Sequence, residues 1–504
     1  MKIKTVGKLL FAGVCGLVMT GCSTVVNSHL QKADMMTAYE SGNNAEVMQE
    51  IDYKLREPKW YNSSVVNTGD EIMWRLEAGS MNFHQGNFAE CIEQFKVAEH
   101  LICEYDNRAK VSARDAGAEA GAALTNMNTL PYRGFCRDRL ALSIYKSLAY
   151  LGSDNESAFR AQLRRLRNEQ KKVQDDYREF FEAEKAEIEA AKKDNPEAAK
   201  KADETASESQ LANDPQNADF STGLEEVKRV ANKGYGNFLN PAAIFLSGLG
   251  SVRDGNFDNA RIDFKRLYEA MPQNPMCRQY YVTVLQKAGR DIPSELKNVK
   301  PFDFPLENDC VYVIFANGRG AAFKQIAIYF PIMTAWPMCE FYVAPFEKLQ
   351  AQADEQTHSS VLLVDMDGVI AQEFTERLPG MITRIVLSTL IKEGAYYGGL
   401  TAIWQSNMNP VAKCVAWCSV AIGGAAYRAA MNTADTRTWE TLPKEFQLAQ
   451  FPMPKNREIV LNLQGNGNIS KTVQIPDDCR SAVIFVSAPS DQNVNCHVLP
   501  IKSK

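Results

Sequence analysis

The 504-residue chain has few of the residues that usually carry catalysis or bind nucleic acid. Its 56 lysines and arginines are outnumbered by 61 acidic residues, which gives a formal charge of −5. There is no basic surplus to bind a polynucleotide by releasing its counterions, so no nucleic-acid partner is expected. A Gly-x-Ser-x-Gly elbow and a phosphate-binding glycine loop are both missing. The five histidines lack metal-ligand spacing, and His84 is interpreted as a surface or capping residue. No cofactor, metal or catalytic residue is predicted.

The N-terminus has the three-part layout of a bacterial export signal. Three lysines within the first eight residues precede the apolar run 9–19, which is too short to span a bilayer comfortably. Residues 19–22 (Met-Thr-Gly-Cys) then resemble the lipobox of bacterial lipoproteins, whose cysteine is acylated and becomes the new N-terminus. Ser23 is not the Asp that usually retains such proteins in the inner membrane. We therefore expect Cys22 to be a lipid anchor in the outer membrane, on its periplasmic face. The alternative is an ordinary secretory signal with a chance cysteine.

The remaining cysteines do not form a recognisable disulfide framework. Ten are left besides Cys15 and Cys22, and an envelope compartment permits disulfides, but a chain of this size has core enough without them. Cys414 and Cys418 lie four residues apart in an expected helix, with no His or carboxylate beside them. We interpret this pair as small core residues rather than metal ligands.

Two segments share the spacing of a helix–turn–helix repeat. The matching positions are Trp74, Gly79, Gly86, Phe88, Phe95 and Ala98 in the first, and Gly248, Gly255, Phe257, Ala260, Phe264 and Pro272 in the second. The pattern resembles a tetratricopeptide repeat, and a third, degenerate copy runs over 140–158. At least three such pairs must stack to bury their apolar faces, and the stack leaves a groove suited to a peptide or partner helix. The alternative is that the pairs pack on the rest of the chain and no groove is in use.

A long charged helix and a linker are expected between the repeats. From Phe159 to Tyr177 apolar residues recur at helical spacing in a highly charged segment. Residues 194–222 have almost no large apolar residue, and we expect a flexible linker. We expect five regions along the chain: a signal peptide at 1–21, helical repeats at 22–193, the linker at 194–222, further repeats at 223–298 and an α+β domain at 299–504.

Beyond residue 299 the periodicity changes from helical to strand-like. The runs 311–315 and 326–330 flank an Asn-Gly-Arg-Gly turn signal and predict a β-hairpin. Residues 383–430 are helical and rich in small residues, and we interpret them as buried rather than membrane-spanning. Alternating strands follow at 459–463 and 481–486. The predicted fold is an array of α-helical repeats followed by an α+β domain.

A strand ending at Val364 leads into Asp365-Met-Asp367-Gly, which looks like the first motif of haloacid-dehalogenase-type phosphatases. In that superfamily the first Asp attacks phosphorus, the second acts as general acid/base, and Mg²⁺ bridges carboxylate and phosphate. The resemblance would make Asp365 the nucleophile and Asp367 the acid/base. That fold also requires a doubly wound sheet after the motif, whereas small-residue helices follow here. A phosphatase is therefore kept only as an alternative.

Several landmarks together resemble a family of uncharacterised tetratricopeptide-containing envelope lipoproteins of bacteria. They are the lipobox and the strings at 139–148, 240–248, 315–318, 377–380 and 434–443. The resemblance implies no catalytic residue and, from the genes found near members of the family, a role in envelope assembly. In the last and most specific string, Arg437 is expected to stack on or pair near Trp439 and pin a loop. The alternative is an exposed Trp and Arg hot spot for a partner.

The sequence thus predicts a lipid-anchored scaffold rather than an enzyme. Its contact with the membrane would be the acyl anchor at Cys22, and its envelope protein partners would bind through the repeat groove. Two alternatives stay open: the membrane-tethered phosphatase, and a pore or secretion-system component that inserts its small-residue helices.

Overall fold

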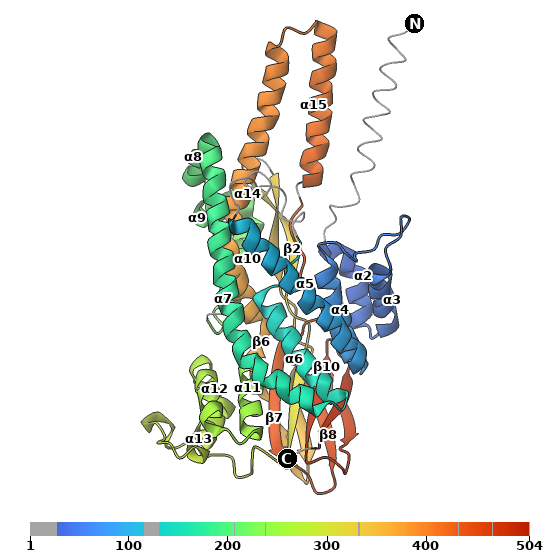
Figure 1. The fold of residues 1–504 in the computed structure, drawn as a ribbon, viewed down its shortest axis with the longest axis vertical. Helices are drawn as coiled ribbons and strands as arrows, with labels where there is room; N and C mark the ends of the chain where they lie inside the picture. Colours follow the sequence, from blue (N-terminus) through green and yellow to red (C-terminus); the bar gives the residue numbers. More distant parts are fainter. Residues whose placement is uncertain are drawn as a thin grey trace.

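The computed structural model describes residues 28–114, 131–205, 207–236, 238–330, 333–431, 433–465 and 467–502. The described chain combines helices with three β-sheets, which agrees with the predicted mixture of α and β structure (Figure 1). The helices are α2 (Ser28–Glu40), α3 (Asn44–Leu55), α4 (Glu71–His84), α5 (Phe88–Arg114), α6 (Cys136–Gly152), α7 (Glu156–Asp194), α8 (Pro196–Thr205), α9 (Glu208–Asn213), η2 (Pro215–Asn217), α10 (Ala218–Ala231), α11 (Pro241–Arg253), α12 (Phe257–Ala270), α13 (Pro275–Lys287), η3 (Ser294–Leu296), α14 (Met366–Gln405) and α15 (Pro410–Met431). The strands are β1 (Cys310–Asn317), β2 (Ala322–Tyr329), β3 (Met333–Glu340), β4 (Phe346–Ala353), β5 (Gln356–Ser359), β6 (Val361–Asp365), β7 (Glu445–Pro452), β8 (Glu458–Gly465), β9 (Ile469–Gln474), β10 (Ser481–Ala488) and β11 (Asn495–Ile501).

The central sheet has the strand order β11-β10-β1-β7-β6. Strand β1 pairs with β10 in parallel, with Val313 opposite Ile484, and with β7 in antiparallel. Both β1 and β10 are buried along their whole length, because each face of this sheet is covered. Strands buried on both faces read as continuous apolar runs, which is why 311–315 and 481–486 contain so few polar residues.

The two faces of the central sheet belong to different apolar cores. Tyr312 and Ile314 point into the core shared with the helices, whereas Val311 and Val313 point into a core shared with the sheet β5-β4-β8-β9. This alternation follows from the two-residue period of a strand. The molecule therefore has a layer of helices, the central sheet, and a second sheet behind it. The helix core crosses the boundary expected between residues 298 and 299, so the two predicted regions share one interior.

The helices of the first layer form a continuous row of pairs. Each of the pairs α4–α5, α6–α7 and α11–α12 is joined by a three-residue turn, and α7 packs against α11 although the two are far apart in sequence. In α4–α5 a side chain at Gly79 would overlap the ring of Phe95, and in α11–α12 a Cβ at Gly248 would lie 2.9 Å from Phe264. In both pairs the phenylalanine follows the glycine by sixteen residues. The glycines thus allow each pair to pack closely.

The first helix of each pair packs onto the C-terminal half of the chain. Helix α6 contacts β11, α11 contacts β6, and the ring of Tyr145 on α6 packs at a tilt against Phe485 of β10. His84 at the end of α4 is buried, with ring nitrogens 2.9 Å from Ser487 Oγ and from Asn493 Oδ1. The expectation of a surface or capping role for His84 is therefore wrong, because the central sheet covers this end of α4.

The segment 194–222, expected to be a flexible linker, is instead built from helices. Residues of α8, α9 and α10 form a second core with the β2–β3 hairpin and the first half of α14. Phe220 is buried against Trp336 of β3, and Ala202 and Leu211 are also buried. The linker expectation fails because the few apolar residues of the segment are enough to join it to a core whose other side chains come from distant parts of the chain.

Two further expectations in the C-terminal half are corrected by the fold. The runs 311–315 and 326–330 do not pair with each other: β1 lies inside the central sheet, and β2 forms a hairpin with β3. The helical segment 383–430 is only partly buried, since α14 and α15 form a helical hairpin that extends beyond the rest of the described chain (Figure 1). Cys414 and Cys418 lie on this hairpin and are exposed, so they are not core residues.

Candidate functional site

The residues singled out from the sequence lie in different parts of the fold. Cys22 falls outside the described residues. Asp365 and Asp367 lie where β6 runs into α14, and Arg437 and Trp439 lie in the segment between α15 and β7. Within the described residues there is no group of three or more His, Cys, Asp or Glu side chains that could hold a metal ion.

The two aspartates of the phosphatase-like motif have structural partners. Asp365 is the N-cap of α14, since its Oδ1 accepts a hydrogen bond from the backbone N–H of Gly368 at 2.9 Å. Asp367 is only 2% exposed; its Oδ2 forms an ion pair with Lys444, and its Oδ1 accepts from the N–H of Ala321 at 2.8 Å. Burial raises the pKa of Asp367 to about 6, against the lowering effect of Lys444.

The strand that carries these aspartates also differs from the phosphatase arrangement. Strand β6 is at the edge of the central sheet and pairs only with β7, in antiparallel. The superfamily resemblance implies a nucleophile at the end of a strand inside a doubly wound parallel sheet. Asp365 instead follows an antiparallel edge strand. The geometry therefore gives the phosphatase interpretation no support.

Arg437 and Trp439 are both buried. Arg437 donates to Asp435 at 2.8 Å and to Asp70 at 2.9 Å. The indole N–H of Trp439 donates to Ser80 Oγ at 3.0 Å, and its ring packs against Phe95. At 6% and 1% exposure, neither side chain can form the exposed hot spot considered as the alternative. Both side chains tie the segment before β7 to helix α4.

A buried ion pair, which the sequence pattern does not reveal, completes this junction. Lys32 Nζ lies 2.6 Å from Glu77 Oε1, and both side chains are fully buried. Glu77 also accepts hydrogen bonds from the backbone N–H groups of Glu440 and Thr441, at 2.8 and 3.1 Å. Burying a carboxylate is tolerable only when it is paired and hydrogen-bonded, as it is here. The repeat-like helix α4 is thus bound to the C-terminal half by charge as well as by apolar contact.

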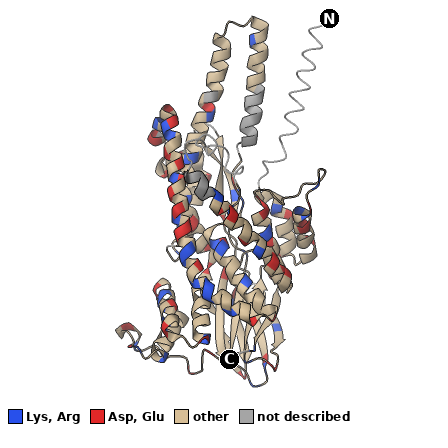
Figure 2. Ribbon diagram, in the orientation of Figure 1, with Lys and Arg blue, Asp and Glu red and all other residues tan. Residues whose placement is uncertain are grey.

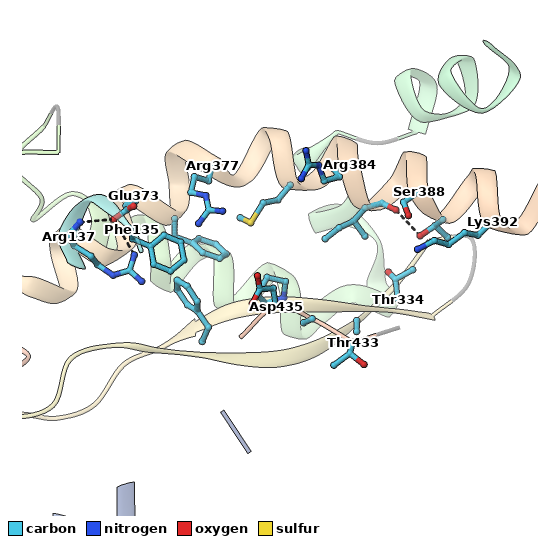
Figure 3. A pocket seen from close by; sticks show the side chains of 18 residues that line it. Phe135, Arg137, Thr334, Glu373, Arg377, Arg384, Ser388, Lys392, Thr433 and Asp435 are labelled. Atoms are coloured by element: carbon cyan, nitrogen blue, oxygen red, sulfur yellow. Dashed lines mark hydrogen bonds and ion pairs between the residues drawn. The ribbon is translucent and has the colours of Figure 1, made fainter. Parts of the chain in front are cut away.

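The strongest candidate for a binding site is a cavity at the base of the helical hairpin. It has a volume of about 90 Å³ and lies between α14, β3 and the chain that follows α15 (Figure 3). Its apolar wall includes the rings of Phe135, Phe323 and Phe374. Its charged lining consists of four cationic and two acidic side chains: Arg137, Arg377, Arg384, Lys392, Glu373 and Asp435.

Most of these charges are already paired within the chain. Arg137 lies 3.2 Å from Glu373, and Arg384 donates to Glu187 at 2.8 Å. The guanidinium of Arg377 stacks over the ring of Phe135 at 4.8 Å, on the same ring as Arg137 at 4.0 Å. The buried Nε atoms of both arginines have no hydrogen-bond partner among the described residues. Figure 3 shows the Arg377 side chain pointing from α14 toward the cavity.

The chemistry of this cavity suits a small anionic group attached to an apolar part. Burial lowers the pKa of Lys392, and an anion beside it would raise that pKa again by favouring the charged ammonium. An unpaired guanidinium N–H supplies a directed, charge-assisted donor. Arg377, Arg384 and Lys392 are seven and eight residues apart and so share one face of α14. This spacing of cations along one helix is the signal by which the sequence could have pointed to the cavity.

Comparison with known proteins adds nothing to this geometry, since no protein-family model, curated protein or solved structure matches the chain.

Proposed function

We propose that this chain is a lipid-anchored envelope protein that works as a non-enzymatic scaffold. In this proposal Cys22 is acylated, the body faces the periplasm from the outer membrane, and tetratricopeptide-type helix pairs hold partner proteins during envelope assembly. The signal layout, the lipobox-like residues 19–22 and the family resemblance support the location.

The observation that carries the scaffold proposal is the unbroken row of three helix pairs. The pairs have equal turn lengths, and two of them have equivalent glycine–phenylalanine contacts at Gly79 and Gly248. Rows of this kind bind other proteins through their extended surfaces. The chain's own C-terminal half covers the face made by α4, α6 and α11. We therefore place partner contact on the outer helices α5, α7 and α12 rather than in the groove expected from the sequence.

Metabolic labelling with an alkyne-bearing fatty acid in a bacterial host tests the anchor. The full-length chain and the Cys15→Ala variant should both be labelled, because Cys15 lies inside the apolar run that is removed. Cys22→Ala should lose the label and leave the membrane fraction. Label that persists in Cys22→Ala, or is missing from the unmodified chain, would refute the anchor.

In-cell cross-linking followed by mass spectrometry tests the scaffold. The expected result is a reproducible set of envelope proteins cross-linked to lysines of the outer helices, such as Lys96 on α5 and Lys265 on α12, which are exposed. The unanchored Cys22→Ala chain serves as the control. Cross-links that come only from the β5-β4-β8-β9 sheet, or none beyond that control, would contradict the proposal.

A second candidate function is the binding of an anionic group in the cavity at the hairpin base, favoured by the buried Nε atoms of Arg137 and Arg377, which have no hydrogen-bond partner among the described residues. Inorganic phosphate and acetate are suitable probes for calorimetry and thermal-shift measurements. Arg377→Gln should abolish binding. Arg164→Gln, at a side chain that is 64% exposed and far from the cavity lining, should leave it unchanged. Equal behaviour of the two variants would refute the site.

A further inference from the structure

The helical hairpin of α14 and α15 is the most isolated element of the described fold. The first part of α14, through Leu387, is buried in the second core. Beyond this part the two helices run side by side, away from the body (Figure 1). An element that leaves a folded body in this way usually has an apolar surface only if something else covers it.

The outer part of the hairpin is apolar and almost uncharged. From residue 394 to 421 the sequence contains one charged residue, Lys413, and no acidic residue. Figure 2 shows the same contrast between the tan hairpin and the red and blue body. The exposed large apolar side chains of this part are Tyr397, Trp404, Met408, Val411, Val415 and Trp417. Trp404 is 68% and Val411 70% exposed, so neither is covered by the partner helix of the hairpin.

These side chains do not form a single stripe. Val411 and Val415 are one helical turn apart on α15, whereas Trp417 is about a third of a turn away around the axis. Further apolar side chains lie on α14 and in the connecting turn. A helix that docks on one protein surface presents one apolar face, while an element immersed in lipid can be apolar all round. The distribution favours a lipid environment over a protein groove.

The chain between the proposed anchor and the body is too short to keep the hairpin out of the membrane. The backbone N–H of His29 donates to Thr436 Oγ1 at 3.2 Å, five residues after the end of α15, so α2 begins beside the hairpin base. The six residues from Cys22 to Ser28 span at most about 22 Å. Helix α15, with 22 residues, is about 33 Å long. Even with this segment fully extended, a lipid on Cys22 would thus lie at least about 11 Å short of the hairpin tip.

We propose that the tip of the α14–α15 hairpin inserts into the headgroup and outer acyl region of the membrane that holds the Cys22 anchor. The lipid bilayer is its partner. A minimum depth of about 11 Å already reaches the boundary of headgroups and acyl chains at which interfacial helices lie. Trp404 and Trp417 have the amphipathic rings that favour this boundary. Lys413 donates to the backbone carbonyl of Trp404 at 2.8 Å, so the single cation near the tip also caps a helix end.

Among the described residues, no helix combines the length and apolarity that crossing a membrane requires. The depth inferred above concerns the tip alone. The depth estimate rests on the proposed lipid anchor, whereas the apolar, uncharged tip is independent of it. The two can therefore be tested separately.

Vesicle flotation tests insertion without the anchor. The chain from Ser23 to Lys504, which lacks Cys22, is mixed with vesicles of phosphatidylethanolamine and phosphatidylglycerol and centrifuged through a density gradient. It should float with the vesicles. The triple variant Trp404→Ser, Val411→Ser, Trp417→Ser should stay at the bottom, with an unchanged melting temperature because these side chains are exposed. Trp60→Ser is the matched control, since Trp60 is 96% exposed elsewhere, and it should float normally.

The exposed cysteines of the hairpin allow a direct measurement of depth. Among the described residues only Cys103, Cys414 and Cys418 are exposed. A polarity-sensitive fluorophore on the Cys103→Ser chain therefore reports from the hairpin, and its emission should rise several-fold when vesicles are added. The Cys414→Ser, Cys418→Ser chain, labelled at Cys103, should show no rise.

The outcomes separate this inference from the proposed anchor. If the unlipidated chain neither floats nor changes fluorescence, the insertion is refuted, whatever fatty-acid labelling shows at Cys22. If it floats but Cys22 carries no lipid, the insertion stands and the anchor fails. If the triple variant instead abolishes a dimer seen by light scattering without vesicles, the tip is an interface between copies and the lipid proposal is wrong.

Discussion

The buried contact between Lys32 and Glu77 offers the sharpest test of how the helical row is joined to the C-terminal half. The Glu77→Ala change removes the partner of a fully buried ammonium group, leaving Lys32 with the carbonyl of Thr438 at 2.7 Å. It also removes the acceptor for two backbone N–H groups of the segment before β7. Breaking a buried pair costs about 3–5 kcal/mol, and each orphaned N–H adds roughly 1–3 kcal/mol. We expect a loss of at least about 5 kcal/mol in the free energy of unfolding.

Urea unfolding followed by tryptophan fluorescence measures this loss, and an exposed pair provides the control. Glu50 lies 3.5 Å from Lys54 on α3, in a partly exposed i,i+4 geometry, and Glu50→Ala should cost no more than about 0.5 kcal/mol. The double variant Lys32→Met, Glu77→Ala should recover part of the loss, because the unpaired charge is removed with its partner. If Glu77→Ala costs as little as Glu50→Ala, the segment before β7 is not docked on α4 and the shared core described here is wrong.

Three further predictions concern packing and pH. Gly79→Ala should destabilise the fold by about 1–3 kcal/mol, because the new methyl group meets the ring of Phe95. Gly398→Ala has open space around the new methyl group and should raise stability by up to about 1 kcal/mol. Thermal melts of the two variants measure this difference. Burial lowers the pKa of His84 to about 4, below the 6.5 of an unfolded histidine. The contribution of neutral His84 to the free energy of unfolding is therefore present above pH 6.5, and it should decline as pH falls toward 4, by roughly 3 kcal/mol in total. The stability of a His84→Gln chain should depend less on pH over that range. Trp439→Phe should lower the melting temperature without altering any cross-linked partner, since the indole is buried against α4; a lost partner at unchanged stability would contradict this.

Sequence periodicity was sufficient to predict secondary structure and close helix pairs where these depend on neighbours within one element or one pair. The segments 311–315 and 481–486 predicted strands, and both are strands. The second was expected to alternate between an apolar and a polar face, but it is buried on both faces. The spacing of Gly79 and Phe95, repeated at Gly248 and Phe264, predicted close helix pairs, and each glycine does face its phenylalanine. Such features depend on neighbours within one element or one pair, which the local sequence encodes.

Periodicity did not predict burial or strand pairing where the residues packed against a segment come from a distant part of the chain. Residues 194–222 have few large apolar side chains, but the β2–β3 hairpin and α14 supply the surface that buries Leu211 and Phe220. The run at 311–315 found its partners in β10 and β7, more than a hundred residues away, rather than in the next strand. Pairing over that distance is set by the competition among all strands, which a local turn signal does not decide.

The candidate sites divide in the same way. The residue types alone suggest chemical roles: Cys22 for a lipid, Asp365 and Asp367 for phosphoryl chemistry, and Arg437 and Trp439 for a contact. How the described ones are used depends on burial and on partners from other elements. Lys444, just before β7, for example pairs with Asp367 at the start of α14. The same is true of the hairpin. Its sequence predicts apolar helices, but their burial depends on whether other elements pack against them. The outer part of α14 and α15 extends away from the body and is not covered by it.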